Sequence, residues 1–219
     1  MAYSTIFFDL DGTLTDSAEG IIKSIEYAFD CCGILAAGTD FTKYIGPSLR
    51  ESFHNHTDDP NVVSAMIEAY RVRYSRKGVF ENRLYPGIKE VLTSLYEKGH
   101  TLCLATAKPE AFALQVLDQH GLLDFFTFTA CASLDKCRET KDAVLAYALE
   151  NVPGNKREML MVGDREHDIL GAAAHGLDAV GVLYGFGTKE ELEACSPIYI
   201  AGTVADLRTF LLAKSPLPV

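Results

Sequence analysis

Several features are missing from this chain of 219 residues. It has no run of about 20 apolar residues, so no membrane-spanning segment is expected. The stretch after Met1 lacks a basic region, and Asp9 interrupts its apolar residues early, so it does not resemble a secretory signal. Internal repeats and low-complexity segments are also missing, which argues against a repeat architecture.

The cysteines lack the C-x-x-C spacing that is typical of many metal and redox sites. The chain has six cysteines, and Cys103 lies inside an apolar run where a core position is expected. The even number does not argue for disulfides, because the chain is not small and shows no secretory signal. We therefore expect reduced thiols and a cytoplasmic protein.

Basic residues are in deficit. Lysine and arginine number 20 against 30 acidic residues, which gives a formal net charge of −10. A broad nucleic-acid surface needs clustered lysine and arginine, so no nucleic-acid partner is expected. The acidic balance favours solubility but does not exclude an anionic substrate, because a bound metal and a few local cations can outweigh the global charge.

What the chain does contain is an ordinary globular composition, with 48% hydrophobic and 23% charged residues. Apolar runs alternate with helical patterns. Strands are expected at residues 5–8, 102–106, 126–128, 159–162, 179–182 and 199–200, and helices at 88–99, 109–121, 141–150, 168–175 and 205–213. This alternation predicts an α/β fold with a doubly wound, mostly parallel sheet and right-handed crossovers.

Residues 16–85 follow a different pattern. Helical stripes occur there, no strand is expected, and Asp16 with Glu19 is predicted to cap a first helix that ends before Gly33. We therefore expect residues 1–15 and 86–219 to form the α/β core domain, and residues 16–85 to form an inserted helical cap domain.

Polar residues follow the predicted strands at their carboxyl ends, where open α/β sheets bind ligands. Clustered carboxylates with little sulfur or imidazole suit Mg²⁺, a hard cation that prefers oxygen. Phosphoryl transfer needs a nucleophile, charge neutralisation and a proton donor, and this set contains all three. The residues expected to converge are Asp9, Asp11, Thr106, Lys141, Asp164 and, one helical turn later, Asp168.

These residues lie in four motifs that resemble those of the haloacid dehalogenase superfamily. Residues 9–14 (DLDGTL) resemble the first motif, and Thr106 within residues 105–108 (ATAK) resembles the second. Lys141 resembles the third, and Asp164 and Asp168 within residues 163–168 resemble the fourth. The resemblance covers essentially the whole chain. A helical insert directly after the first motif resembles the branch with phosphoglycolate phosphatases, β-phosphoglucomutases and 5′-nucleotidase-like proteins.

The resemblance implies Mg²⁺-dependent hydrolysis of a small phosphate monoester through an aspartyl-phosphate on Asp9. Asp11 would protonate the leaving group and later deprotonate water. Thr106 and Lys141 would hold the phosphoryl oxygens. The metal would be held by Asp9, the backbone carbonyl of Asp11, Asp164 and Asp168, the last acting mostly through water or by orienting its neighbours.

Some positions depart from the commonest pattern of the family. Ala107 stands where asparagine or serine is common, and residues 138–141 (RETK) and 184–187 (YGFG) resemble the 5′-nucleotidase-like branch more closely. We interpret Gly185 and Gly187 as a loop that needs positive φ rather than as a phosphate loop. A phosphomutase of the β-phosphoglucomutase type and a non-catalytic phosphometabolite-binding module remain alternatives.

The substrate stays open among nucleoside 5′-monophosphates, phosphoglycolate, sugar phosphates and pyrophosphate. Within the cap, Ser48 is expected to cap a helix whose first turn contains Arg50. Related mutases carry an arginine near this point that contacts the non-transferring part of the substrate. A surface arginine paired with Glu51 is an equal alternative. The expected partner is a small phosphorylated metabolite, and the protein is expected to be a monomer or a homodimer.

Overall fold

The structure is a computed structural model that describes residues 2–36, 38–133 and 138–214. It divides the chain into two compact units. The first comprises Met1–Thr15 with Leu84–Val219, and the second comprises Asp16–Arg83. The inserted segment was predicted at residues 16–85.

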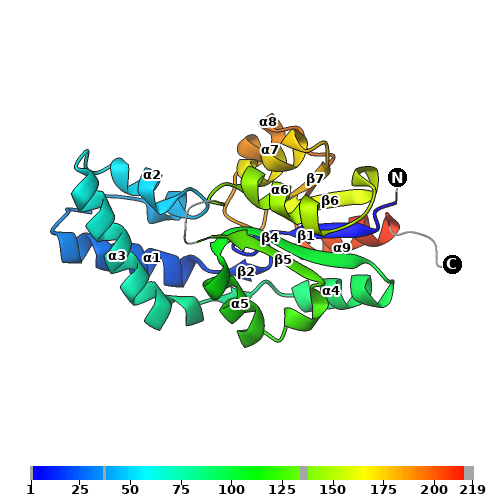
Figure 1. Ribbon diagram of the computed structural model, residues 1–219, viewed down its shortest axis with the longest axis horizontal. Helices are drawn as coiled ribbons and strands as arrows, with labels where there is room; N and C mark the ends of the chain where they lie inside the picture. Colours follow the sequence, from blue (N-terminus) through cyan, green and yellow to red (C-terminus); the bar gives the residue numbers. More distant parts are fainter. Residues whose placement is uncertain (1, 37, 134–137, 215–219) are drawn as a thin grey trace. The chain divides into compact units, whose positions relative to one another are not determined.

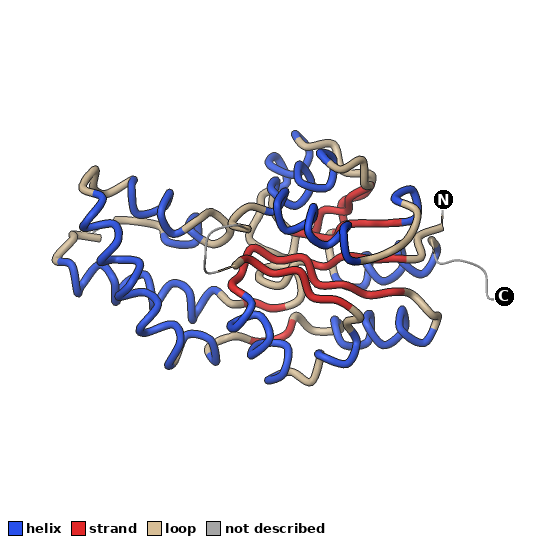
Figure 2. Tube along the Cα trace, viewed as in Figure 1, coloured by secondary structure: helices blue, strands red, loops and turns tan. Residues whose placement is uncertain are grey.

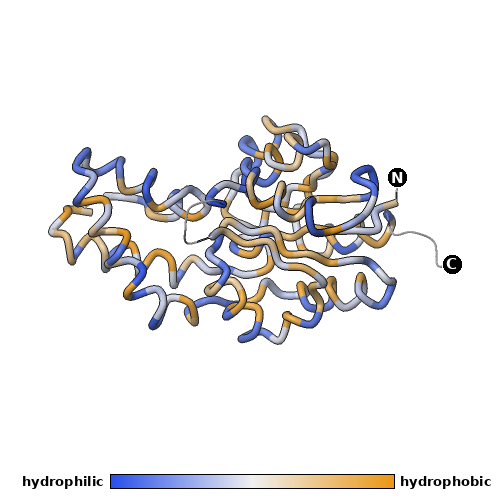
Figure 3. Tube along the Cα trace, in the orientation of Figure 1, coloured by the Kyte–Doolittle hydropathy of each residue, from blue (hydrophilic) through white to orange (hydrophobic). Residues whose placement is uncertain are grey.

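The first unit is built on a parallel sheet, which among the described residues has six strands in the order β5-β4-β1-β6-β7-β8. The central strand β1 (Thr5–Phe8) is buried along its whole length, as expected for a strand covered on both faces. Figure 3 shows the apolar character of the strands. The other strands are β4 (Thr101–Pro109), β5 (Phe128–Ala132), β6 (Met159–Gly163), β7 (Asp178–Val182) and β8 (Tyr199–Ala201).

Helices cover both faces of this sheet (Figure 1). On one face α6 (Lys141–Asn151) packs on β4 and β5, and α7 (Glu166–Ala174) packs on β6 and β7. The other face is covered by α4 (Ile88–Glu97), α5 (Glu110–Gln119) and α9 (Val204–Ala213), while α8 (Lys189–Ala194) packs against α7. The α/β class and the doubly wound arrangement predicted from the sequence are confirmed.

The second unit is helical (Figure 2). Its helix α1 (Ala18–Cys32) packs along α3 (Pro60–Arg76), and α2 (Leu49–His54) packs on α3. Short 3-10 turns lie at Phe41–Tyr44 and Gly78–Phe80. The buried ring of Phe29 makes edge contacts with Phe41 and Phe53, which provide an aromatic core for this unit.

Two expected strand limits in the first unit were wrong. The strand predicted at residues 126–128 forms at Phe128–Ala132, because a 3-10 turn at Leu123–Phe125 delays it and its buried residues are the small Ala130, Cys131 and Ala132. Strand β4 continues past residue 106 to Pro109. A residue that precedes proline is driven towards extended backbone, which favours this continuation.

Two further details differ at the ends of the inserted segment. Short strands β2 (Thr15–Asp16) and β3 (Arg83–Leu84) pair where no strand was expected. The predicted Asp16–Glu19 capping pair does not form, because Ser17 occupies the N-cap position and Glu19 pairs with Lys23 instead. Gly33 does end α1 in a left-handed conformation, as predicted, with φ 65°. None of the helices in the described ranges is long and apolar enough to cross a membrane.

In the second unit, the backbone of α1 at Gly20 packs so closely against the backbone at Gly78 that no side chain fits between them. A Cβ added at Gly20 of α1 would lie 2.1 Å from the carbonyl oxygen of Gly78. Alanine normally stabilises a helix interior by about 0.5–1 kcal/mol relative to glycine. Here we expect Gly20→Ala to lower the free energy of unfolding by about 1–3 kcal/mol, because backbone must shift.

Urea denaturation followed by circular dichroism measures this change. The exposed Glu26 on the same helix provides the matched control, and Glu26→Ala should change stability by less than about 0.5 kcal/mol. A stabilised Gly20→Ala variant would show that the contact between α1 and Gly78 is not close in solution.

Candidate active site

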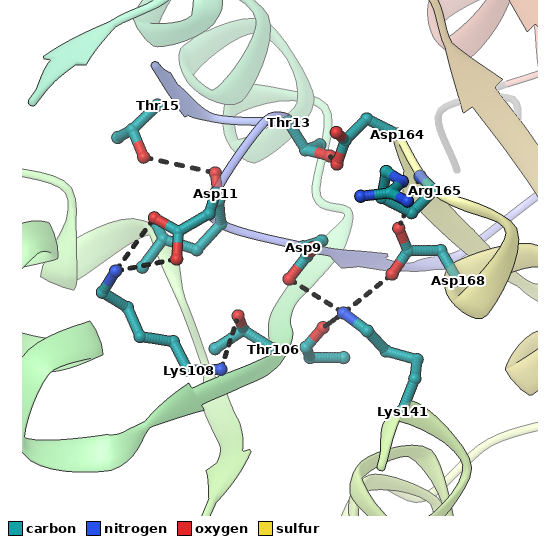
Figure 4. Close-up of polar contacts among 12 residues, drawn as sticks. Asp9, Asp11, Thr13, Thr15, Thr106, Lys108, Lys141, Asp164, Arg165 and Asp168 are labelled. Atoms are coloured by element: carbon teal, nitrogen blue, oxygen red, sulfur yellow. Dashed lines mark hydrogen bonds and ion pairs between the residues drawn. The ribbon is translucent and has the colours of Figure 1, made fainter. Parts of the chain in front are cut away.

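Two neighbouring strands bring carboxylates together at the carboxyl edge of the sheet (Figure 4). Asp9 follows β1, and its backbone N–H donates to the Val162 carbonyl of β6 at 3.0 Å, which places it beside the end of that strand. Asp164 follows β6, and Asp168 lies in the first turn of α7. One oxygen from each of these three side chains lies within 4.8 Å of the others.

Lys141 is the cation at this cluster. It is the first residue of α6, whose start is capped by the Thr140 hydroxyl, and its side chain is 5% exposed. Its Nζ lies 2.8 Å from Oδ1 of Asp9 and 2.7 Å from Oδ1 of Asp168, and it donates to the Ala105 carbonyl at 2.7 Å. Lys141 therefore connects the residue that follows β1, the middle of β4 and the start of α7.

Asp168 is held at both oxygens. Its Oδ1 pairs with Lys141, and its Oδ2 accepts a hydrogen bond of 3.1 Å from the backbone N–H of Arg165. The side chain is only 1% exposed. This geometry fits a residue that orients its neighbours, as the sequence suggested for Asp168.

Asp164 is completely buried among backbone and hydroxyl donors. The Thr13 hydroxyl donates to its Oδ1 at 3.3 Å, and the Phe186 N–H donates to its Oδ2 at 2.8 Å. The Tyr184 hydroxyl in turn donates to the Thr13 carbonyl at 3.2 Å. The segment at residues 184–187 thus forms one wall around Asp164.

The glycines of that segment have a different role from the one predicted. Neither Gly185 nor Gly187 is among the residues with positive φ, so the expected left-handed loop was wrong. A Cβ at Gly185 would lie 2.4 Å from Cβ of Asp164, and a Cβ at Gly187 would lie 1.9 Å from the Asp164 carbonyl oxygen. Both positions need glycine because the backbone passes directly against Asp164. Gly12 packs on the same carboxylate, and it does have positive φ, at 85°.

Burial dominates the electrostatics of the cluster. It raises the pKa of Asp9 to about 6, although the Lys141 charge and hydrogen bonds from Lys141 and Thr106 act to lower it. Burial, followed by the charges of Asp168 and Asp9, also raises the pKa of Asp164 well above its usual value. Burial acts to lower the pKa of Lys141, but the carboxylates of Asp168 and Asp9 outweigh it and raise that pKa.

The Asp11 side chain pairs with Lys108 and not with Lys141. Both of its carboxylate oxygens accept hydrogen bonds from Nζ of Lys108, at 3.0 and 2.7 Å. From the sequence, Lys108 was expected only to be a neighbour of Thr106 and had no predicted role. The available signal was its place two residues after Thr106, since alternate residues of a strand share a face.

Thr106 lies within β4 rather than at its end, and its hydroxyl accepts a hydrogen bond of 3.2 Å from the Lys108 N–H. The side chain is buried and hydrogen-bonds Asp9. Six of the predicted site residues therefore lie in the first unit, at or near the carboxyl edge of the sheet.

Arg50 belongs to the second unit, where it is exposed in the first turn of α2. The predicted cap of this helix is present, because the Ser48 hydroxyl accepts a hydrogen bond of 3.2 Å from the Glu51 N–H. The role of Arg50 stays a prediction.

The donor set suits a hard divalent cation. The cluster has three carboxylates, of which Asp164 and Asp168 are buried and Asp9 is partly buried. In the ion pairs of the described residues, one ammonium, that of Lys141, pairs with two of them, which leaves negative charge uncompensated. Their oxygens are the ligands that Mg²⁺ prefers, and no described cysteine or histidine joins the group. The residues present therefore fit a magnesium ion.

A family model described as haloacid dehalogenase-like hydrolase matches residues 6–182. The chain belongs to this family. It is 36% identical over 213 residues to a protein named 5′-nucleotidase from Pseudomonas aeruginosa, a match that covers 96% of each chain. It is 38% identical over 209 residues to the tyrosine-protein kinase PtkA of Mycobacterium tuberculosis, covering 94% of this chain and 72% of that protein.

A solved structure agrees with the fold. A predicted phosphatase from Clostridium acetobutylicum is 39% identical and superposes with a TM-score of 0.91. The match covers 97% of this chain and all of that one. The family resemblance drawn from the four motifs is thereby confirmed.

The raised carboxylate pKa values predict how metal and pH act together on stability. A carboxyl whose pKa is higher in the folded state stabilises the fold when protonated, and this contribution is lost as pH rises from about 4 through about 6. A divalent cation binds the ionised carboxylates and opposes that loss. We expect millimolar MgCl₂ to raise the melting temperature more at about pH 7.5 than at about pH 5.

Thermal unfolding with MgCl₂ or with chelator at the two pH values tests this expectation. Asp164→Asn should remove most of the magnesium-dependent shift. The control Asp206→Asn, at an exposed position of α9, should preserve it. An equal shift at both pH values, or an unchanged shift in Asp164→Asn, would contradict a metal site at this cluster.

Proposed function

We propose that this protein hydrolyses small phosphate monoesters in a Mg²⁺-dependent reaction, through an aspartyl-phosphate on Asp9. The observation that supports this most is the placement of the Asp9 carboxylate. It directly follows the central strand, lies beside Thr106 and Lys141, and shares its cluster with two buried carboxylates.

In the first half-reaction, a carboxylate oxygen of Asp9 attacks phosphorus and the bond from phosphorus to the ester oxygen breaks. The leaving oxygen takes a proton from the carboxyl group of Asp11. Thr106 and Lys141 hold the phosphoryl oxygens, because a hydroxyl and an ammonium beside Asp9 are the donors nearest to the transferred group.

In the second half-reaction, water attacks the phosphorus of the aspartyl-phosphate and the bond from phosphorus to Asp9 breaks. Asp11, now ionised, accepts the proton of this water. Phosphate leaves and Asp9 is restored as a carboxylate. The same residue thus serves as acid and then as base.

Asp9, Asp164 and the backbone carbonyl of Asp11 would hold the Mg²⁺, with Asp168 orienting its neighbours. When bound, this ion supplies charge neutralisation for the nucleophile and the phosphoryl oxygens. The ion pair between Lys141 and Asp168, at 2.7 Å, would orient the ammonium beside the nucleophile.

Nucleoside 5′-monophosphates are the first substrates to test, because a relative of nearly equal length is named 5′-nucleotidase. Phosphoglycolate, sugar phosphates and pyrophosphate complete the panel. Release of inorganic phosphate supports the hydrolase. A requirement for a bisphosphate activator would indicate a phosphomutase, and ligand binding without turnover would indicate a binding module.

Replacing the nucleophile tests the mechanism directly. We expect Asp9→Ala to fold normally and to lower kcat by more than about a thousandfold, or roughly 4 kcal/mol of barrier, because the covalent route is lost. Phosphate release measures turnover, and acid quenching with a labelled substrate detects the phosphoenzyme.

The exposed Asp118 on α5 provides the control, and Asp118→Asn should keep the wild-type rate. Near wild-type turnover in Asp9→Ala, or a phosphoenzyme that survives this substitution, would overturn the assignment of Asp9.

Substrate discrimination is proposed to come from the second unit, because the four motifs handle only the transferred phosphoryl group. We expect Arg50→Ala to raise KM for the preferred substrate severalfold and to change the ranking of the panel. Hydrolysis of p-nitrophenyl phosphate should change much less. Lys43→Ala, at an exposed position of the same unit, is the control. An equal effect on all substrates, or none, would remove Arg50 from the specificity residues.

A further inference from the structure

Lys108 forms a second buried ion pair at the carboxyl edge of the sheet. Its side chain is 5% exposed and that of Asp11 is 18% exposed. The Lys108 Nζ contacts both oxygens of Asp11, so the carboxylate is held against rotation as well as against displacement (Figure 4). The motifs that carry the family resemblance assign Lys108 no task.

The backbone around Lys108 is arranged to aim this side chain. The pairing of β4 with β5 shifts register between Thr106 and Pro109, and such irregularities redirect side chains next to active sites. The hydroxyl of Thr106 accepts the Lys108 N–H, and Pro109 restricts the preceding residue to extended backbone. Two neighbours therefore fix the conformation from which Lys108 reaches Asp11.

Stability alone is a poor explanation for this pair. Removing an ammonium and a carboxylate from water costs more than most such pairs regain, so a buried ion pair is weak evidence for a stabilising role. Asp11 is also the residue on which both proton transfers of the proposed reaction depend. A constraint on its orientation has a direct effect on chemistry.

We propose that Lys108 is a positioning residue that holds the Asp11 carboxyl in line with the leaving oxygen and then with the attacking water. The inference rests on the proposed function. In the first half-reaction Asp11 gives its proton to the ester oxygen as the phosphorus–oxygen bond breaks. In the second it takes a proton from water as the bond from phosphorus to Asp9 breaks. Lys108 itself exchanges no proton and contacts no substrate.

This role predicts a dependence on the leaving group. An alkoxide needs its proton during departure, whereas p-nitrophenolate is stable without one. Formation of the aspartyl-phosphate from p-nitrophenyl phosphate therefore needs no well-placed Asp11. Hydrolysis of the aspartyl-phosphate by water does need it. General acid–base catalysis contributes about 10²–10⁴-fold, which sets the range of the expected loss.

We expect Lys108→Met to lower kcat/KM for an alkyl ester such as a nucleoside 5′-monophosphate by about a hundredfold. For p-nitrophenyl phosphate kcat/KM should fall less than about threefold, because this parameter reports the first half-reaction. A rapid burst of p-nitrophenol, followed by slow turnover, should appear in the variant. Lys108→Arg keeps the charge and can donate two parallel hydrogen bonds to the carboxylate, so it should recover part of the alkyl-ester rate.

Lys189→Met is the matched control, because it removes a lysine whose pair with Glu193 is exposed, and it should behave as wild type with both esters. Thermal unfolding checks that each variant folds. If Lys108→Met does not fold, Lys108→Gln takes its place in the same comparison.

If Lys108→Met loses kcat/KM equally with the two esters, or with neither, the inference is overturned while the proposed function stays intact. A wild-type protein that releases phosphate from neither ester would overturn the proposed function and this inference with it. A loss of kcat/KM confined to the alkyl ester, together with a burst of p-nitrophenol before slow turnover of the aryl ester, supports the positioning role.

Discussion

The burial of a cluster of carboxylates is the constraint around which this structure is organised. Asp9, Asp164 and Asp168 approach one another in a place that water barely reaches, and Lys141 balances only part of their charge. Such a cluster is unfavourable unless protons or a cation neutralise it. The raised pKa of Asp9 and the fit to a divalent cation are therefore two consequences of one arrangement.

The sheet makes this arrangement unavoidable. Phe8 of β1 is in register with Val162 of β6, so residues that follow the two strands emerge side by side. Apolar strands on both sides hold that edge in place, and glycines let Asp164 pack against backbone without a gap. A fold that relieved the repulsion by separating Asp9 from Asp164 would have to break the pairing at the centre of the sheet.

The strands and the contacts around the carboxylate cluster differ in how far they can be predicted from the sequence. The strands, the alternation with helices and the residues at the strand ends follow from local patterns, as do the caps at Gly33 and Ser48. The displaced strand β5 was missed because its buried residues are small and have weak strand preference. Gly185 was misread because its reason for being glycine is the tertiary contact with Asp164, which no local pattern contains. Lys108 was passed over because β4 was expected to end at residue 106, although a local signal existed, since alternate residues of a strand share a face.

The two lysines of the site, Lys108 and Lys141, pair with different carboxylates, and the proposed reaction gives this separation a purpose. Lys141 pairs with Asp9, the proposed nucleophile, whereas Lys108 pairs with Asp11, the proposed acid and base. In the proposed reaction, a cation bound at Asp9 and Asp164 would change the charge around Lys141. A single lysine serving both carboxylates would shift its position at that moment, and the proton donor would move with it. Separate lysines, one starting α6 and one near the end of β4, allow the nucleophile to be neutralised while Asp11 keeps its orientation.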